Sequence, residues 1–303
     1  MSLRNVEWPT LLLLVLTYVT WGIGTLLWGH SALLSILLTA VAITQHASLQ
    51  HEALHGHPFR NARLNEALVF APLALFIPYR RFRDTHLQHH FDPNLTDPYD
   101  DPESHYQDPA HWARIGTVKR ALWVANNTLA GRMVLGPILG NFCFVRTDMQ
   151  AIFQGDATIR QDWALHVAGL MLVAAWLYVA PMPVWAYLLA VWLGVALLKI
   201  RSFLEHRAHE ACRARTVVIE DRGPLALLYL NNNFHVVHHM HPQVPWYELP
   251  GLYAERKAHY LRRNDGYVYR SYAEVFRRYF LHVKDPVPHP VWPVRKAPMP
   301  DDC

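Results

Sequence analysis

Residues 9–50 read PTLLLLVLTYVTWGIGTLLWGHSALLSILLTAVAITQHASLQ, a run of 42 residues without Asp, Glu, Lys or Arg. A helix needs about 20 apolar residues to cross a bilayer, so this run is long enough for two crossings. The stretch Trp28–Ser31 in its middle provides a turn between them. We therefore predict two membrane spans at about residues 9–28 and 32–50.

A second run, from Trp163 to Leu198, has 36 residues without a charged side chain. Its turn at Ala180–Pro183 predicts two more spans, at about residues 163–180 and 184–201. Hydrophobic residues make up 52% of the chain and charged residues 17%, which is a low charge content for a soluble protein. These features predict an all-α integral membrane protein with four transmembrane helices arranged as two hairpins.

The basic residues predict how the spans are oriented. Of the 28 Lys and Arg residues, one precedes the first span, eleven lie at 51–161 and sixteen lie from Lys199 onward, while neither hairpin turn has any. Cytoplasmic segments carry the excess of Lys and Arg, so both termini and both polar segments, 51–162 and 202–303, are expected in the cytoplasm. The two segments would form one cytoplasmic cap, and the whole chain, 1–303, one domain.

The 20 histidines carry the chemical signal. We call three clusters box one (HEALH, 51–55), box two (HLQHH, 86–90) and box three (HVVHH, 235–239), and a fourth cluster is EHRAH at 205–209. Positions three or four apart share a helix face, so the rings of each box point the same way. Box one and EHRAH each follow directly on a predicted span, so all four clusters can meet at the cytoplasmic membrane surface.

Nine imidazoles are enough for two metal ions with positions left for oxygen or water, because one tetrahedral zinc takes only four ligands. Imidazole suits both iron and zinc. The three cysteines, in contrast, are too few and too scattered for a zinc ribbon or an iron–sulfur cluster. The predicted metal ligands are His51, His55, His86, His89, His90, His206, His235, His238 and His239.

Two other classes of protein compete with this interpretation. Box one matches H-E-x-x-H, the signature of zinc metalloproteases, with Glu52 as general base. A protease would need only one further ligand and would leave boxes two and three without a role. A metal transporter would place its ligands along the spans, where only the unclustered His30, His46 and His166 occur.

With three boxes in this order and two pairs of spans, the chain resembles the membrane fatty acid desaturase superfamily, which includes acyl desaturases, hydroxylases and carotenoid-modifying enzymes. The stretch from His51 through the segment Leu95–Glu103 (LTDPYDDPE) is also similar to a bacterial subgroup that includes the rhizopine-catabolism hydrocarbon oxygenase. The resemblance implies a mushroom-shaped four-helix stem and a cap with two non-haem irons, which activate O₂ and attack an unactivated C–H bond. It also implies the nine ligands given above, with His209 as the alternative to His206.

The resemblance further implies a role in lipid metabolism, with desaturation of a fatty acyl or lipid chain as the leading reaction. Hydroxylation or other monooxygenation of a hydrocarbon, carotenoid or O-methyl substrate is the alternative. The sequence shows no recognisable electron-transfer motif, so we expect a separate electron donor, such as a ferredoxin or rubredoxin with its reductase. We expect no nucleic-acid partner. A bacterial inner membrane is the expected location.

Several polar side chains are placed to support the ligands. Glu205, Asn233, Asp97, Asp101 and His209 lie beside the histidine clusters in the sequence and are candidates for contacts to ligand imidazoles. The apolar segment Leu68–Pro78 is too short to span, and we expect it at the membrane interface or within the cap. The proline-rich end from Pro286 is expected to be an extended tail.

Overall fold

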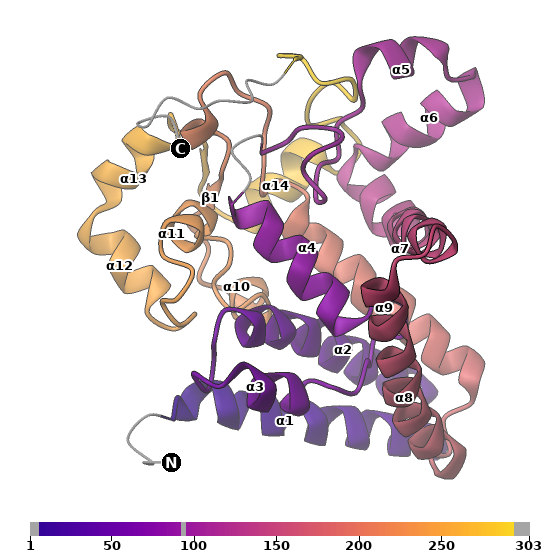
Figure 1. Cartoon of the computed structure of the whole chain (residues 1–303). Helices are drawn as coiled ribbons and strands as arrows, with labels where there is room; N and C mark the ends of the chain where they lie inside the picture. Colours follow the sequence, from indigo (N-terminus) through magenta and orange to yellow (C-terminus); the bar gives the residue numbers. More distant parts are fainter. Residues whose placement is uncertain (1–5, 92–94, 294–303) are drawn as a thin grey trace. The chain divides into compact units, whose positions relative to one another are not determined.

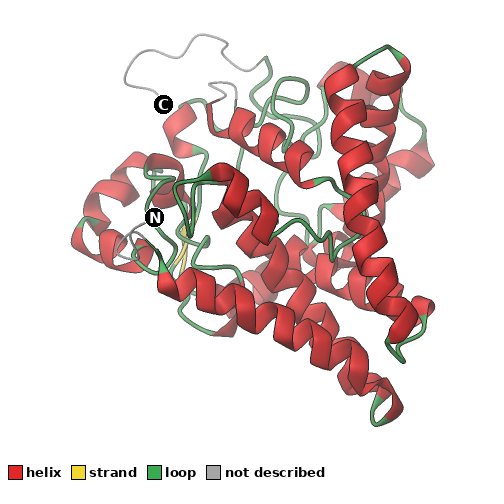
Figure 2. Ribbon diagram, turned by 60° about the horizontal axis from the view of Figure 1, so that its bottom comes forward, coloured by secondary structure: helices red, strands yellow, loops and turns green. Residues whose placement is uncertain are grey.

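The computed structural model describes residues 6–91 and 95–293, and within them the chain forms two helical units (Figures 1 and 2). The first, which we call the span unit, takes the described residues up to Arg83, then Pro137–Leu198 and Leu228–Leu230. The second, the histidine unit, takes Asp84–Gly136, Lys199–Leu227 and the described residues from Asn231 onward. The prediction of one domain over 1–303 stays a prediction.

The span unit contains four helices long and apolar enough to cross a membrane, which confirms the predicted number of spans. They are α1 (Trp8–Leu26, continued by the 3-10 turn η2, Leu27–Gly29), α2 (Ala32–Leu54), α8 (Ala157–Val179) and α9 (Val184–Ser202). Helix α8 begins six residues before the predicted span, because the Asp156 side chain accepts a hydrogen bond from the Ile159 amide and caps the helix at Ala157.

Close backbone contacts hold these helices together. A Cβ on Gly24 of α1 would lie 2.7 Å from Thr39 Oγ1 of α2, and one on Gly194 of α9 would lie 2.8 Å from the Ala40 carbonyl oxygen. Small residues of this kind let membrane helices approach closely. All four helices contribute to one buried apolar core, formed by Trp21, Ala40, Ala42, Ile43, Leu73, Val173, Met182, Ala186, Tyr187, Ala190, Val191 and Val195.

The segment Leu68–Pro78 packs against this core through Ala71 and Leu73–Leu75 and belongs to the span unit, not to a cap, while Phe76 is 41% exposed. Leu73 is fully buried there against Trp21 and Tyr187. Glu66 before the segment and Arg80 after it form an ion pair, so the two ends of the segment lie close together. It is therefore a re-entrant loop among the spans.

Polar side chains of the spans explain how an irregular backbone is tolerated there. Non-helical backbone at membrane depth must be satisfied by the protein, since lipid offers no hydrogen bonds. Four side chains supply these bonds to the loop's carbonyl oxygens: Tyr18 Oη to Leu68 (2.8 Å), Gln50 Nε2 to Val69 (3.3 Å), Tyr187 Oη to Leu73 (2.8 Å) and His166 Nε2 to Leu75 (2.8 Å).

The remaining helices and strands are short, apart from two. They are α3 (Ala62–Leu68), α4 (Tyr79–Phe91), α5 (Pro109–Arg114), α6 (Thr117–Asn126), α7 (Leu129–Phe153), the 3-10 turn η3 (Cys212–Ala214), β1 (Val218–Ile219), α10 (Pro224–Leu228), α11 (His235–Met240), α12 (Leu249–Glu255), α13 (Lys257–Arg263), β2 (Val268–Tyr269) and α14 (Tyr272–Tyr279). In the histidine unit β1 pairs in parallel with β2.

Backbone pairing fixes the start of box three in the histidine unit. The Ile219 amide of β1 donates to the Asn233 carbonyl oxygen, and the Val236 amide of α11 donates to the Val217 carbonyl oxygen. Val236 and Val237 then point into a second apolar core together with Phe234. The residues between the histidines of box three are therefore the ones that anchor its helix.

Because the re-entrant loop packs against only one of two glycines in the spans, we expect substitutions of these glycines to differ in their effect on stability. A Cβ on Gly169 of α8 would lie 2.8 Å from Pro72 Cδ and 2.9 Å from the Phe70 carbonyl oxygen, whereas one on Gly22 of α1 would meet only Trp176, at 3.7 Å. Gly169→Ala should therefore lower the free energy of unfolding by about 1–3 kcal/mol relative to Gly22→Ala, because overpacking displaces the loop. Thermal unfolding of both variants in detergent measures this, and equal midpoints would show that the loop does not pack there.

Candidate metal centre

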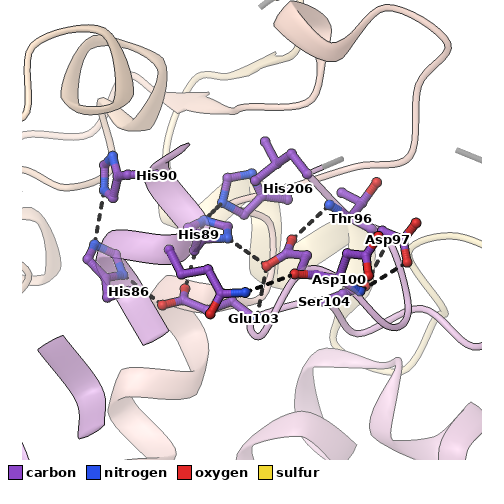
Figure 3. A network of polar contacts seen from close by, with 12 residues as sticks. His86, His89, His90, Thr96, Asp97, Asp100, Glu103, Ser104 and His206 are labelled. Atoms are coloured by element: carbon purple, nitrogen blue, oxygen red, sulfur yellow. Dashed lines mark hydrogen bonds and ion pairs between the residues drawn. The ribbon is translucent and has the colours of Figure 1, made fainter. Parts of the chain in front are cut away.

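Boxes two and three place their histidines on short helices of the histidine unit, and His206 joins them from the segment after α9. His86, His89 and His90 occupy the second half of α4, so their rings lie along one helix face (Figure 3). Box three occupies α11 from its first residue. Within this unit the rings form two groups.

The first group consists of His89, His206, His235 and His239. One ligand atom from each lies within 4.8 Å of the others. The Nε2 atom of His206 lies 2.9 Å from that of His89 and 3.0 Å from that of His235, which in turn lies 3.1 Å from His239 Nε2. Two nitrogens bound to one tetrahedral ion at about 2.0 Å would lie about 3.3 Å apart, so this spacing suits a metal site.

The second group contains His86, His90 and His238. The Nε2 atom of His90 lies 3.0 Å from that of His86 and 3.1 Å from that of His238. The two groups are neighbours within the unit, since the rings of His90 and His239 stack with centroids 4.2 Å apart. Two adjacent groups of ring nitrogens are the arrangement expected for a pair of metal ions.

Box one lies in the span unit. His51 is on the last turn of α2 and His55 is its C-cap residue, with ring centroids 4.9 Å apart. The two rings thus share one face of the helix end, as the spacing predicted. Their membership in the same centre as boxes two and three stays a prediction.

Carboxylates fix the proton position on two of the rings. Glu103 lies 2.7 Å from His86 Nδ1 (Figure 3). Asp101 lies 2.8 Å from His89 Nδ1. An ionised carboxylate can only accept, so in each pair Nδ1 donates its proton. In the neutral ring Nε2 then carries a lone pair, directed toward the next histidine.

These lone pairs face nitrogens about 3 Å away, and a cation between them removes their repulsion. Burial lowers the pKa of His206, His235 and His239 well below the ordinary value, and the nearby imidazoles lower it further. Neutral rings at neutral pH are the form that binds metal. The donor set therefore fits a metal ion of the kind that imidazole prefers, such as iron or zinc.

The pKa values of His89 and Glu103 shift in the directions expected for partners of opposite charge. Burial lowers the pKa of His89, but the carboxylates of Glu103 and Asp101 outweigh it and raise the pKa to about 9. Burial raises the pKa of Glu103, but the charges of His86 and His89 outweigh it and hold the pKa well below its ordinary value. The carboxylate thus stays ionised beside the rings.

The supporting side chains differ in part from those expected. Asp101 contacts a ligand histidine as predicted, but Glu103, which the sequence analysis did not single out, does the same for His86. Asp97 does not reach a histidine, because its Oδ1 accepts from the Tyr99 and Asp100 amides and caps a turn. Only the fold of the loop decides which of these acids faces the rings.

Beside box three, Asn232 contacts a histidine, whereas we had predicted this contact for Asn233. His235 Nδ1 lies 3.3 Å from Asn232 Oδ1, and Asn232 Nδ2 donates to Glu205 Oε1 at 2.9 Å. Glu205, which also forms an ion pair with Arg201 (Nε–Oε1 3.1 Å), therefore acts on His235 through Asn232. Asn233 instead donates to the Ile219 and Asp221 carbonyl oxygens and holds the backbone around β1.

The structure separates the two candidate ligands after α9. His206 is in the first group. His209 lies 3.4 Å from the exposed Asp265, and its Nδ1 accepts from the Ala211 amide. His206 is therefore the histidine of EHRAH that the fold brings to the other rings.

Four apolar helices and two groups of buried histidines able to hold metal define a class, a membrane protein with histidine metal sites. The family model Fatty acid desaturase matches residues 26–272 of the chain, so the protein belongs to the fatty acid desaturase family. No curated protein matches it. Membership confirms the predicted superfamily and implies a membrane oxidoreductase of the desaturase or hydroxylase type, not a zinc protease; the bacterial subgroup stays a prediction.

Loss of the Glu103 carboxylate should weaken metal binding. Glu103→Gln removes the charge that fixes the Nδ1 proton of His86, and partners of this kind are worth about 10–100-fold in metal affinity. Metal retention during titration with a chelator measures the effect. Glu255→Gln, an exposed change on α12, is the matched control. Equal retention in the two variants would show that Glu103 does not support a ligand.

Proposed function

We propose that this protein is an O₂-dependent non-haem di-iron oxidoreductase that desaturates a fatty acyl or lipid chain. The observation that carries the proposal is the pair of adjacent histidine groups in the histidine unit of a chain that belongs to the desaturase family. Two adjacent groups of imidazole nitrogens suit two ions, and the family resemblance favours iron over zinc. Four apolar helices supply access to a lipid substrate.

The first iron would be held by His89, His206, His235 and His239. The second would be held by His86, His90 and His238, and we propose that His51 and His55 complete its ligand set. Their rings share one face of the end of α2, where a membrane span ends. When bound, the two irons would supply the activation of O₂ and the removal of hydrogen from a C–H bond.

The chain's own residues prepare this centre. Glu103 and Asp101 hold protons on the Nδ1 atoms of His86 and His89 and so direct the Nε2 lone pairs inward. Asn232, held by Glu205, does the same for His235 if its amide oxygen accepts from Nδ1. Burial lowers the pKa of His206, His235 and His239, which keeps these three rings in the neutral form that binds metal.

We propose that the histidine unit and both termini lie on the cytoplasmic side of a bacterial inner membrane. The support is the distribution of basic residues, 27 of 28 of which lie in the polar segments or at the end of α9, with none in the turns at 28–31 and 180–183. The electrons that the reaction needs would come from a separate ferredoxin or rubredoxin with its reductase.

We propose that exposed basic side chains between Arg256 and Arg278 form the surface that would receive that donor, and we call it the basic surface. These side chains are Arg256, Lys257, Arg262, Arg270, Arg277 and Arg278, each of which is exposed. Complementary charge steers association and raises its rate by about 10–1,000-fold. An acidic redox protein is the partner with matching charge.

Charge reversal on this surface should slow electron delivery. Arg262→Glu with Arg270→Glu should lower kcat/KM for the donor about tenfold at low salt and flatten its salt dependence. Lys119→Glu on the exposed side of α6 is the control. A loss of activity seen only in vesicles of anionic lipid would show instead that the surface binds headgroups.

The proposed reaction is tested with protein purified without oxygen and analysed for metal. We expect two irons per chain and, after addition of O₂, a reducing system and labelled acyl lipids, a product with a new double bond. His235→Ala should abolish product and lower the iron content, while His282→Ala, an exposed histidine outside both groups, should not. A hydroxylated product would favour the monooxygenase alternative, and one zinc in place of iron would contradict the proposal.

A further inference from the structure

His206 is held differently from the histidines of boxes two and three. It lies outside any helix, since α9 ends at Ser202, and its backbone forms an antiparallel bridge with Thr216. Its Nδ1 atom is buried and has no hydrogen-bond partner among the residues that the structure describes. His86 and His89 in contrast lie on a helix and have a carboxylate on Nδ1. The orientation of the His206 ring must therefore be set through its backbone.

Lys284 provides such a contact from the C-terminal part of the chain. Its ammonium donates to the His206 carbonyl oxygen at 2.8 Å, and its side chain is only 5% exposed. The Nζ atom also lies over the rings of Tyr106 and Phe203, 5.8 and 5.9 Å from their centroids. Burying an ammonium costs free energy unless it is paired and hydrogen-bonded. The hydrogen bond to the His206 carbonyl oxygen therefore stabilises Lys284 in its buried position.

A second contact holds the chain two residues further on. The Ala208 amide donates to the Tyr106 hydroxyl at 2.8 Å, and that hydroxyl donates to the Asp285 carboxylate. Asp285 follows Lys284 directly, and its carboxylate lies 3.8 Å from Nζ. The backbone on the C-terminal side of the His206 ring is thus held at two points by adjacent residues of one segment.

The same segment is tied to the unit by backbone hydrogen bonds. The Lys284 amide donates to the Asn127 carbonyl oxygen at 3.1 Å. The Gln107 amide donates to the Val287 carbonyl oxygen, and the His289 amide returns a bond to the Gln107 carbonyl oxygen, both at 2.9 Å. Residues 283–289 therefore form a packed strap, which includes the first residues of the proline-rich end from Pro286 that we expected to be an extended tail.

We propose that this strap, Val283–His289, positions His206 for metal binding, with Lys284 as its main positioning residue and the Tyr106–Asp285 pair as the second. The bridge to Thr216 holds one side of the His206 backbone, and the strap holds its carbonyl group, so that Nε2 stays within 3.0 Å of the Nε2 atoms of both His89 and His235. This inference rests on the proposed metal centre. It assigns a role in that centre to a segment about 80 residues from the ligand it holds.

The test uses the full chain in detergent and Lys284→Met, which keeps the length of the side chain but cannot donate. We expect it to release metal at about tenfold lower chelator concentration than the wild type, the loss typical of a removed supporting contact. Hydrogen exchange of the metal-free protein should be faster at residues 203–208. Lys119→Met, which makes the same change at an exposed position on α6, is the control for loss of charge.

Two further variants separate positioning from general stability. Lys284→Arg, which restores a donor, should recover part of the metal retention, and Tyr106→Phe should lose it to a smaller extent than Lys284→Met. The inference is overturned if Lys284→Met retains metal like the wild type, or if the metal-free variant melts well below metal-free wild type and Lys284→Arg gives no recovery. Wild-type protein without any bound metal would instead contradict the proposed function.

Discussion

Buried imidazoles that face one another nitrogen to nitrogen are the constraint on which this structure depends. The Nε2 atoms of neighbouring rings lie 2.9–3.1 Å apart, and Glu103 and Asp101 occupy the opposite nitrogens of two of them. In the neutral state such rings cannot all be donors to one another, so a cation is the natural way to satisfy them. The carboxylates, the asparagine beside box three and the strap after α14 all serve this arrangement.

The span unit solves a related problem of unsatisfied polar groups in a different solvent. Its re-entrant loop exposes carbonyl oxygens among helices that lipid cannot hydrate. Side chains of Tyr18, Gln50, Tyr187 and His166 meet those oxygens, which explains why polar residues occur within otherwise apolar spans. A histidine in a span need not be a metal ligand; His166 has a structural task here.

Supporting contacts in the histidine unit follow from whether a ligand lies on a helix. A helix fixes the backbone of a histidine, so a partner on the second ring nitrogen is enough to orient it, as for His86 and His89. A ligand on an irregular segment needs its backbone held as well, and His206 has Lys284 and Tyr106 nearby for this. The two kinds of support explain why the residues around the rings come from so many parts of the chain.

Local pattern alone determined the spans and the boxes. Runs of 42 and 36 uncharged residues require a membrane, and histidines three and four apart share a helix face whatever the rest of the fold does. Tertiary structure alone decided that Glu103 and Asn232 reach the rings in place of Asp97 and Asn233, that Leu68–Pro78 packs among the spans, and that residues 283–289 hold His206. Apart from the Asn232–His235 contact, which spans only three residues, those contacts join residues whose spacing has no helical or strand period. They arise from packing and hydrogen bonding between distant segments, which a local pattern does not encode.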